Sequence, residues 1–139
     1  MMRSFRRAIV LLLAATPIVA AQEPEPDFAK HLFAPELVMQ HQQAVRLTPE
    51  QRTAITQGIR DFQLKVVDLQ WKMQDEAQKL TDLVQEAKVD ETQTLAQVDR
   101  VLSIEREIKR AHMALLVRIK NTLTSEQQTT LASLRGTKR

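Results

Sequence analysis

The sequence LTPEQ at residues 47–51 marks the start of a long helix and so decides the fold. Thr48 is placed to act as the N-cap, because its hydroxyl can accept a hydrogen bond from a backbone N–H of the first turn. Pro49 suits the first helical position, where its missing N–H costs nothing, and Gln51 can close a capping box. No proline follows Pro49 in the sequence. A long uninterrupted helix is therefore predicted from this point.

Apolar residues after Pro49 recur at steps of three and four, which is the spacing of one helix face. In this first long helix, predicted to reach about Lys88, they are Ile55, Ile59, Phe62, Val66, Leu69, Met73, Ala77, Leu80, Leu83 or Val84, and Ala87. Aspartates and lysines repeat every seven residues beside them, as is typical of a solvated face; they are Asp61, Asp68, Asp75 and Asp82, with Lys65, Lys72 and Lys79.

A second long helix is predicted from Asp90 to about Asn121. Asp90 is its expected N-cap, with Gln93 at the position that donates to the cap. Its apolar residues are Leu95, Val98, Val101, Leu102, Ile108, Leu115, Leu116 and Ile119. A turn of two or three residues around Val89 would join the two long helices. So short a connection predicts that they pack antiparallel.

Two short helices complete the predicted fold. Pro35 suits the first turn of a helix through about Val45. The sequence LTSEQ at residues 123–127 repeats the earlier motif and opens a final helix, with Leu131 and Leu134 inward and Gly136 at its end. The predicted fold is all-α: an elongated antiparallel helical hairpin of two long helices plus two short helices, expected to form a dimer.

The first 21 residues have the three-part pattern of a secretory signal peptide. Arginines at positions 3, 6 and 7 precede an apolar run over residues 8–20, which ends in small residues. The run has 13 residues, fewer than the roughly 20 that span a bilayer. Cleavage after Ala20 or Ala21 is predicted, which places the mature protein in the periplasm; an uncleaved anchor is the alternative. The remaining chain divides into a flexible leader (22–34), the helical domain (35–136) and a basic tail (137–139).

Composition and charge exclude several classes of function. Without cysteine there is no disulfide, thiolate metal site or thiol nucleophile, and two glycines are too few for a phosphate-binding loop. No catalytic motif is present, so the protein is not expected to be an enzyme. Loss of the signal peptide would leave 17 basic and 17 acidic residues, so the basic pI does not indicate a nucleic-acid partner. Residues 22–99 carry a net charge of −6 and residues 100–139 carry +6. Cancellation within the molecule or across a dimer is favoured over an anionic partner.

The two motif copies carry a family resemblance. Each reads Leu-Thr-x-x-Gln, and together they flank a proline-free helical segment; the residues are Leu47, Thr48, Gln51, Leu123, Thr124 and Gln127. This arrangement resembles the periplasmic LTxxQ family, whose members include Spy/CpxP-type chaperones and ZraP/CnrX-type heavy-metal sensors. The resemblance covers about residues 35–135 and implies a helical hairpin, commonly dimeric, that works in the envelope without ATP.

The resemblance implies a function and a set of partners. The expected function is that of a periplasmic ATP-independent chaperone or envelope-stress accessory protein, which captures unfolded or misfolded envelope proteins on an amphipathic helical surface. A membrane sensor kinase or an anti-sigma factor is a further expected partner. The alternative is a Zn-, Ni- or Co-binding sensor or resistance protein. A structural coiled coil or a Skp-like holdase is a third class, although no strand-like segment is present for the β body of a Skp-like chain.

Three apolar residues of the first long helix lie off its apolar stripe. They are Leu64, Val67 and Trp71, the last being the chain's one tryptophan. Such a cluster indicates an interface rather than isolated exposed residues. It would be buried in a homodimer or under a short helix, or it would bind clients.

A metal site would draw on His41, Glu105 and His112. Glu105 and His112 fall at the centre of the predicted apolar stripe of the second long helix, where a polar group is costly unless it is paired. Imidazole and carboxylate suit Zn, Ni or Co. The His-x-x-x-Met pair that the sensor branch of the family tends to carry is absent, because Val45 follows His41 and Leu116 follows His112 at i+4. No cofactor is required by the chaperone interpretation.

Overall fold

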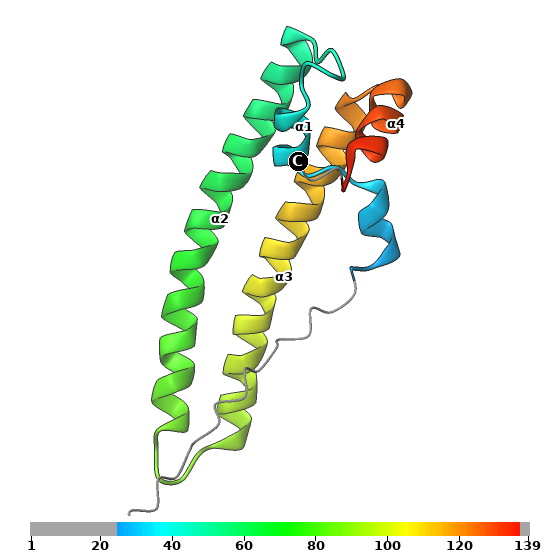
Figure 1. Ribbon diagram of the computed structural model, residues 1–139. Coiled ribbons are helices and arrows are strands. Elements are labelled where there is room, and N and C mark those ends of the chain that lie inside the picture. The colour runs from blue at the N-terminus through cyan, green and yellow to red at the C-terminus, as the bar shows by residue number, and fades with distance from the viewer. Residues whose placement is uncertain (1–24, 137–139) are drawn as a thin grey trace, which may run out of the picture.

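The computed structural model describes residues 25–136, whose regular structure is entirely helical (Figure 1). Its elements are the 3-10 helix η1 (Asp27–His31) and the α-helices α1 (Pro35–Gln40), α2 (Pro49–Val84), α3 (Glu91–Thr122) and α4 (Ser125–Leu134). The all-α prediction is confirmed. The predicted signal peptide (1–21) and basic tail (137–139) lie outside the described residues. Within 25–136, no helix combines the length and apolar character that a membrane span requires.

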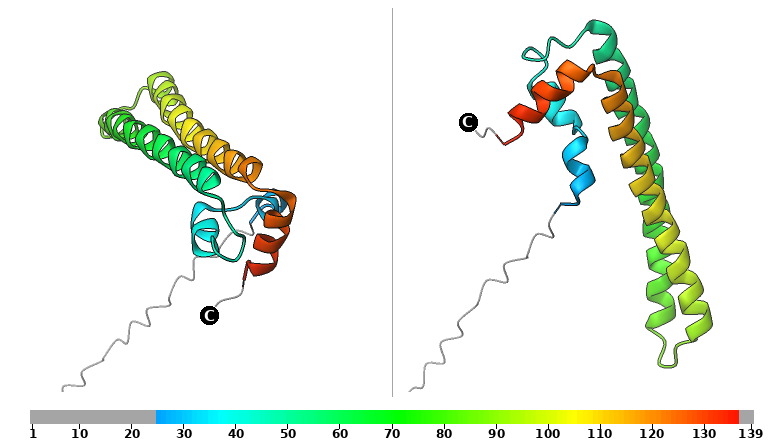
Figure 2. Two further views of the ribbon diagram at one scale, coloured as in Figure 1. Left: turned by 90° about the horizontal axis from the view of Figure 1, so that it is seen from above. Right: turned by 90° about the vertical axis from the view of Figure 1, so that its right-hand side faces the viewer.

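Helices α2 and α3 lie side by side and run in opposite directions (Figures 1 and 2). Far from the chain ends, the Gln97 side-chain amide donates to the Glu76 carbonyl oxygen at 2.8 Å. Toward the other end of the pair, the Arg118 guanidinium lies 3.3 Å from the Asp61 carboxylate. These contacts join positions 21 and 57 residues apart. We call the long two-helix part the arm.

The connection between α2 and α3 is longer than predicted. Helix α2 ends at Val84 rather than near Lys88, and residues 85–90 cross between the helices. The last backbone bond at this end of α2 joins the Gln85 N–H to the Thr81 carbonyl at 3.1 Å. Asp90 caps α3 as predicted, because its carboxylate accepts from the Gln93 backbone N–H at 3.0 Å.

The hydrophobic core sits at one end of the arm, where the ends of several helices meet. We call this end the base. Its buried residues come from every helical element except η1 and also from the connections, and are Phe33, Val38, Val45, Ile55, Leu115, Ile119, Leu123 and Leu131. Away from the base, the buried residues of the described arm are Leu69, Gln97 and Ile104. The molecule therefore has one globular end and a thin two-helix extension (Figure 2).

The segment 25–34, expected to be part of a flexible leader, is docked against the base. Phe33 is 3% exposed and belongs to the core, and the Arg135 guanidinium lies 5.4 Å from the centre of its ring. Arg135 donates hydrogen bonds to the backbone carbonyls on either side of His31, whose own carbonyl accepts from Lys120 Nζ at 2.8 Å. The carbonyls bound by Arg135 are those of Ala29, Lys30 and Leu32. Contacts with residues about a hundred positions away order this segment, and local composition does not report them.

Helix α1 is also shorter than predicted. It ends at Gln40 rather than near Val45, and residues 41–46 form turns. Arg46 has a φ of 50°, a left-handed conformation that reverses the chain just before the first motif. The reversal places Val45 in the core and leads directly into α2.

The buried face of α3 departs from the predicted stripe at two leucines. The other predicted residues are buried or half-buried, namely Val98, Val101, Ile108, Leu115, Leu116 and Ile119. Leu95 and Leu102, expected to point inward, are 56% and 48% exposed. Gln97 and Ile104 take the inward positions instead, followed by Leu115 and Ile119 as predicted. The seam between α2 and α3 therefore passes through Ile104 and Ala111, and the residues that follow them, Glu105 and His112, are exposed.

Candidate functional site

Both predicted capping boxes are formed. At the start of α2, the Gln51 backbone N–H donates to Thr48 Oγ1 at 3.1 Å, and the Thr48 backbone N–H donates to Gln51 Oε1 at 3.1 Å. At the start of α4, Gln127 and Thr124 repeat the pattern at 3.2 and 2.9 Å. Each glutamine therefore satisfies an N–H group that the helix itself leaves without a partner.

The two capping glutamines also bind each other. Gln51 Nε2 donates to Gln127 Oε1 at 2.8 Å, and Gln127 Nε2 donates to Gln51 Oε1 at 2.9 Å. The second N–H of Gln51 bonds the Thr122 carbonyl at 2.8 Å, and that of Gln127 bonds the buried Val45 carbonyl at 3.1 Å. Each amide thus donates two hydrogen bonds and accepts two, which is its full capacity. We call this cluster the glutamine pair.

The leucines of the two motifs support the glutamine pair from the apolar side. Leu123 is buried in the core, and Leu47 packs against the same cluster. Neutral amides and aliphatic side chains offer no nucleophile, acid or base. The six motif residues therefore form a structural junction that joins α2, α3 and α4 at the base.

The off-stripe residues of α2 form an exposed apolar surface, as predicted. Leu64 is 72% exposed, Val67 49% and Trp71 65%. We call these three residues the outer α2 surface. The exposed side chains around it include four charged ones: Arg60, Asp68, Lys72 and Asp75. Burial beneath a short helix of the same chain, one of the expectations for this cluster, is wrong.

The expected metal residues are not gathered into one group. Glu105 and His112 are exposed rather than central in the apolar seam, because Ile104 and Ala111, one residue before each, take the inward positions. The imidazole of His112 lies 5.7 Å from the Phe62 ring, centre to centre. Among residues 25–136, no three His, Cys, Asp or Glu side chains form a cluster that could hold a metal ion. The cost of burying unpaired polar groups, which motivated a metal site, therefore does not apply here.

A polar contact in the middle of the arm was not predicted. Gln97 is buried, and its side-chain amide donates to Glu76 Oε2 at 2.6 Å as well as to the Glu76 backbone. Lys79 lies 2.7 Å from the same carboxylate. The hydrogen bond from Lys79, and then that from Gln97, hold the pKa of the Glu76 carboxyl below its usual value of 4.5. A polar residue amid apolar positions is the only sequence signal for this contact.

This contact predicts a specific dependence of stability on pH. A carboxyl whose pKa is lower in the folded chain stabilises the fold above its unfolded pKa, and that contribution is lost as the pH falls through the lower folded value. The difference in unfolding free energy between the protein and Glu76→Gln should therefore shrink as the pH falls from 7 to 3. Urea unfolding at several pH values measures it. A difference that stays constant between pH 7 and pH 3 would contradict the assignment.

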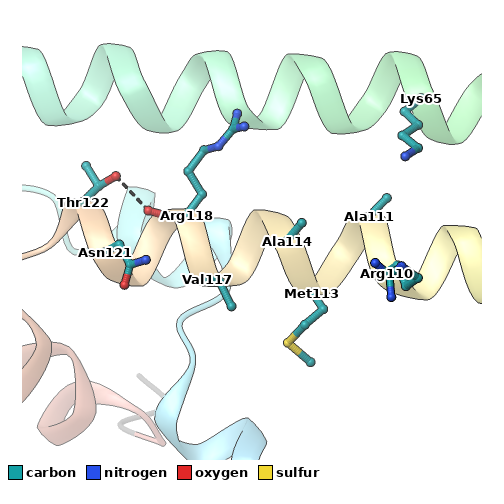
Figure 3. Close-up of a pocket in the computed structure, with 9 residues that line it drawn as sticks. All are labelled: Lys65, Arg110, Ala111, Met113, Ala114, Val117, Arg118, Asn121 and Thr122. Atoms are coloured by element: carbon teal, nitrogen blue, oxygen red, sulfur yellow. Dashed lines mark hydrogen bonds between the residues drawn. The ribbon is translucent and has the colours of Figure 1, made fainter.

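Two hollows flank Met113 on the half of α3 nearest the base. The first, of about 790 Å³, is bordered by Lys65, Arg110 and Arg118, and its apolar lining consists of Ala111, Met113, Ala114 and Val117. Figure 3 shows Arg118 extending toward α2, while Met113 projects from the other side of α3. The second hollow, of about 630 Å³, lies between α3 and the docked N-terminal segment.

Internal ion pairing neutralises little of the basic half of the molecule. Among residues 25–136, a single ion pair joins the acidic and basic halves, between Arg118 and Asp61. Both of its side chains are more than half exposed, so the pair adds little stability. The expected cancellation of charge within one chain thus accounts for a small part of the basic surface along α3.

No family model, curated protein or solved structure matches this chain. The class of protein therefore rests on the described geometry alone. That geometry defines an all-α protein in which an arm of two long helices is joined to a small base through a pair of capping glutamines.

Proposed function

We propose that this chain is a periplasmic, ATP-independent chaperone or envelope-stress accessory protein of the LTxxQ type. It captures unfolded or misfolded envelope proteins on the outer α2 surface. The observation that carries this proposal is the exposed apolar cluster of Leu64, Val67 and Trp71 on an otherwise polar helix face. Exposed clusters of this kind on a soluble protein mark sites of interaction.

The chemistry of this surface suits transient capture. Burial of apolar area stabilises a complex by about 25 cal/mol per Å², so three side chains provide only modest affinity. Charges of both signs surround the cluster, which disfavours tight binding to any one partner charge pattern. A client can then leave by dissociation, with no need for a nucleotide.

The family assignment is supported by the glutamine pair. Two motif copies separated by 76 positions meet through reciprocal bonds, which gives the duplication of Leu-Thr-x-x-Gln a physical purpose. On this proposal the molecule is an elongated helical hairpin that forms a homodimer in the periplasm, where a sensor kinase or anti-sigma factor is a further partner. The metal-sensor alternative has less support, because Glu105 and His112 are exposed and belong to no cluster of metal-ligating side chains among residues 25–136.

The proposal predicts that the double variant Leu64→Ser/Trp71→Ser loses at least half of the protein's ability to suppress client aggregation. Both side chains are exposed, so their replacement removes apolar contact area without disturbing the core. Light scattering of a heat-aggregating client at equimolar protein measures the effect. The matched control is Gln63→Ser/Gln70→Ser, at the two positions immediately before, which are also exposed; it should retain suppression.

Sedimentation velocity on the same variants separates capture from dimer formation. A variant that dissociates into monomers yet suppresses aggregation fully would show that the surface is a dimer contact and that the capture proposal is wrong. If the suppression of client aggregation and the sedimentation coefficient both stayed unchanged, the outer α2 surface would have no binding function. A protein that never suppresses aggregation would contradict the chaperone proposal as a whole.

A further inference from the structure

The second hollow is an apolar groove between α3 and the docked N-terminal segment. We call it the η1 groove. Its volume of about 630 Å³ falls within the roughly 300–1,000 Å³ typical of small-ligand sites. Most of its large side chains are apolar: Phe28, Leu32, Leu37, Met113 and Leu116. Charged groups at its edge are Lys109, Arg135 and Glu25.

We propose that the η1 groove binds a free single-chain fatty acid. The hydrocarbon tail lies between η1 and α3, against Phe28, Met113 and Leu116, and the carboxylate pairs with Lys109. This site lies outside the outer α2 surface and does not depend on the proposed chaperone function.

The groove favours a hydrocarbon tail over a polypeptide because its backbone groups already have partners. The carbonyls of residues 29–32, on the η1 side, accept hydrogen bonds from Arg135 and Lys120. On the α3 side, the backbone is bonded within its own helix. A peptide lying here would bury its own N–H and C=O groups without partners, which costs free energy for each group. An alkyl chain has no such groups.

The charges at the edge of the groove favour an anionic head. Lys109 makes no ion pair or hydrogen bond with any residue of the described chain, so its ammonium is free to bind a ligand. The Arg135 guanidinium adds a second positive charge, and the imidazole of His112 also lines the groove. Among the described residues that line it, Glu25 is the one carboxylate. A carboxylate ligand therefore meets more positive than negative charge.

The first hollow, on the other side of Met113, provides an internal comparison. It has more cations than the η1 groove, but the apolar side chains that line it are smaller on the whole, namely Ala111, Ala114, Met113 and Val117 (Figure 3). Electrostatic attraction alone would favour this hollow, whereas a tail requires the η1 groove. Lys109 borders the η1 groove and its neighbour Arg110 borders the first hollow, so the two positions form a matched pair.

Calorimetric titration of the purified protein with sodium decanoate, below its micelle-forming concentration, tests the proposal. Affinity should rise from octanoate to decanoate by up to about fourfold per methylene, the value for full burial. Lys109→Gln should weaken decanoate binding about fivefold, as expected for loss of one partly exposed charge pair, and Arg110→Gln should leave it unchanged. Phe28→Asp should weaken binding at least tenfold; because Phe28 is 55% exposed, the fold should survive, as circular dichroism can confirm.

Several results would overturn the proposal. These are the absence of decanoate binding at millimolar concentration, equal binding of decylamine, and equal weakening by the Lys109 and Arg110 variants. Tighter binding of an acidic, leucine-rich peptide than of decanoate would assign the groove to a protein partner. Binding only of vesicles that contain phosphatidylglycerol would assign it to a membrane surface. The Leu64→Ser/Trp71→Ser variant should bind decanoate normally, so failure of either proposal is recognisable without the other.

Discussion

Replacement of Gln127 by leucine is expected to destabilise the protein by about 2–4 kcal/mol. The substitution removes both bonds of the glutamine pair and leaves the buried Val45 carbonyl without a donor. A buried polar group that loses its partner costs about 1–3 kcal/mol, and here several groups lose partners together. Gln127→Glu should also be destabilising at neutral pH, because a carboxylate cannot donate to Val45 or to Gln51.

Urea unfolding followed by circular dichroism measures this loss. The matched control is Gln57→Leu, an exposed glutamine of α2 that bonds only its neighbour Asp61 in the described chain; its effect should stay within about 0.5 kcal/mol. The double variant Gln51→Leu/Gln127→Leu should cost less than the sum of the two single variants, since both lose the same two bonds. Additive effects would show that the glutamines act separately.

Replacement of Ile119 by alanine is expected to cost about 2–5 kcal/mol. Ile119 is fully buried, and it lies in the core that joins the ends of the helices at the base. Loss of a large aliphatic side chain from such a position removes its transfer free energy and leaves a cavity. The arm has few buried residues of its own, so it cannot offset the stability that is lost at the base.

Thermal and urea unfolding measure this effect, with Val117→Ala as the control on the same helix. Val117 is 42% exposed, so its truncation should change stability by less than about 1 kcal/mol. A small effect at Ile119 would contradict the assignment of the core to the base. A cost at Val117 equal to that at Ile119 would point to a further contact that covers this face of α3.

Local chemistry explains why much of the fold could be predicted. Threonine caps, a proline at the first helical position and apolar residues at helical spacing act over a few residues. The starts of α2, α3 and α4 were predicted correctly for this reason, at Thr48, Asp90 and Thr124. Gly136, predicted to follow the last helix, has the positive φ of 95° that favours glycine there.

Long-range contacts explain what was missed. Docking of residues 25–34 depends on Arg135 and Lys120, which local patterns cannot connect to that segment. Leu95 and Leu102 were wrongly predicted to point inward because several faces of α3 carry apolar residues, so spacing alone could not select between them. Gly58 is a sequence feature that could have indicated where α2 and α3 pack closely. A Cβ at this position would lie 3.1 Å from Cδ of Arg118, so the glycine makes room for that side chain of α3.

The candidate sites also differ in how well they could be predicted, because one is made by neighbouring residues of a single helix and the other by segments far apart in the sequence. Exposure of the outer α2 surface could be predicted, because it follows from the position of three residues on one helix. The η1 groove could not, because it requires η1, α1 and α3 to come together. The expected inward position of Glu105 and His112 was wrong, because the choice between neighbouring positions of α3 depends on its packing against α2.

The concentration of buried residues at the base has a mechanical consequence. Two helices without a third layer bend more readily than a bundle, and their amide protons should open to exchange with solvent first near the α2–α3 connection. The outer α2 surface lies on the arm, which can bend, whereas the glutamine pair and the core hold the base rigid. The free end of the arm can therefore change its curvature to fit a partner, while the base keeps one shape.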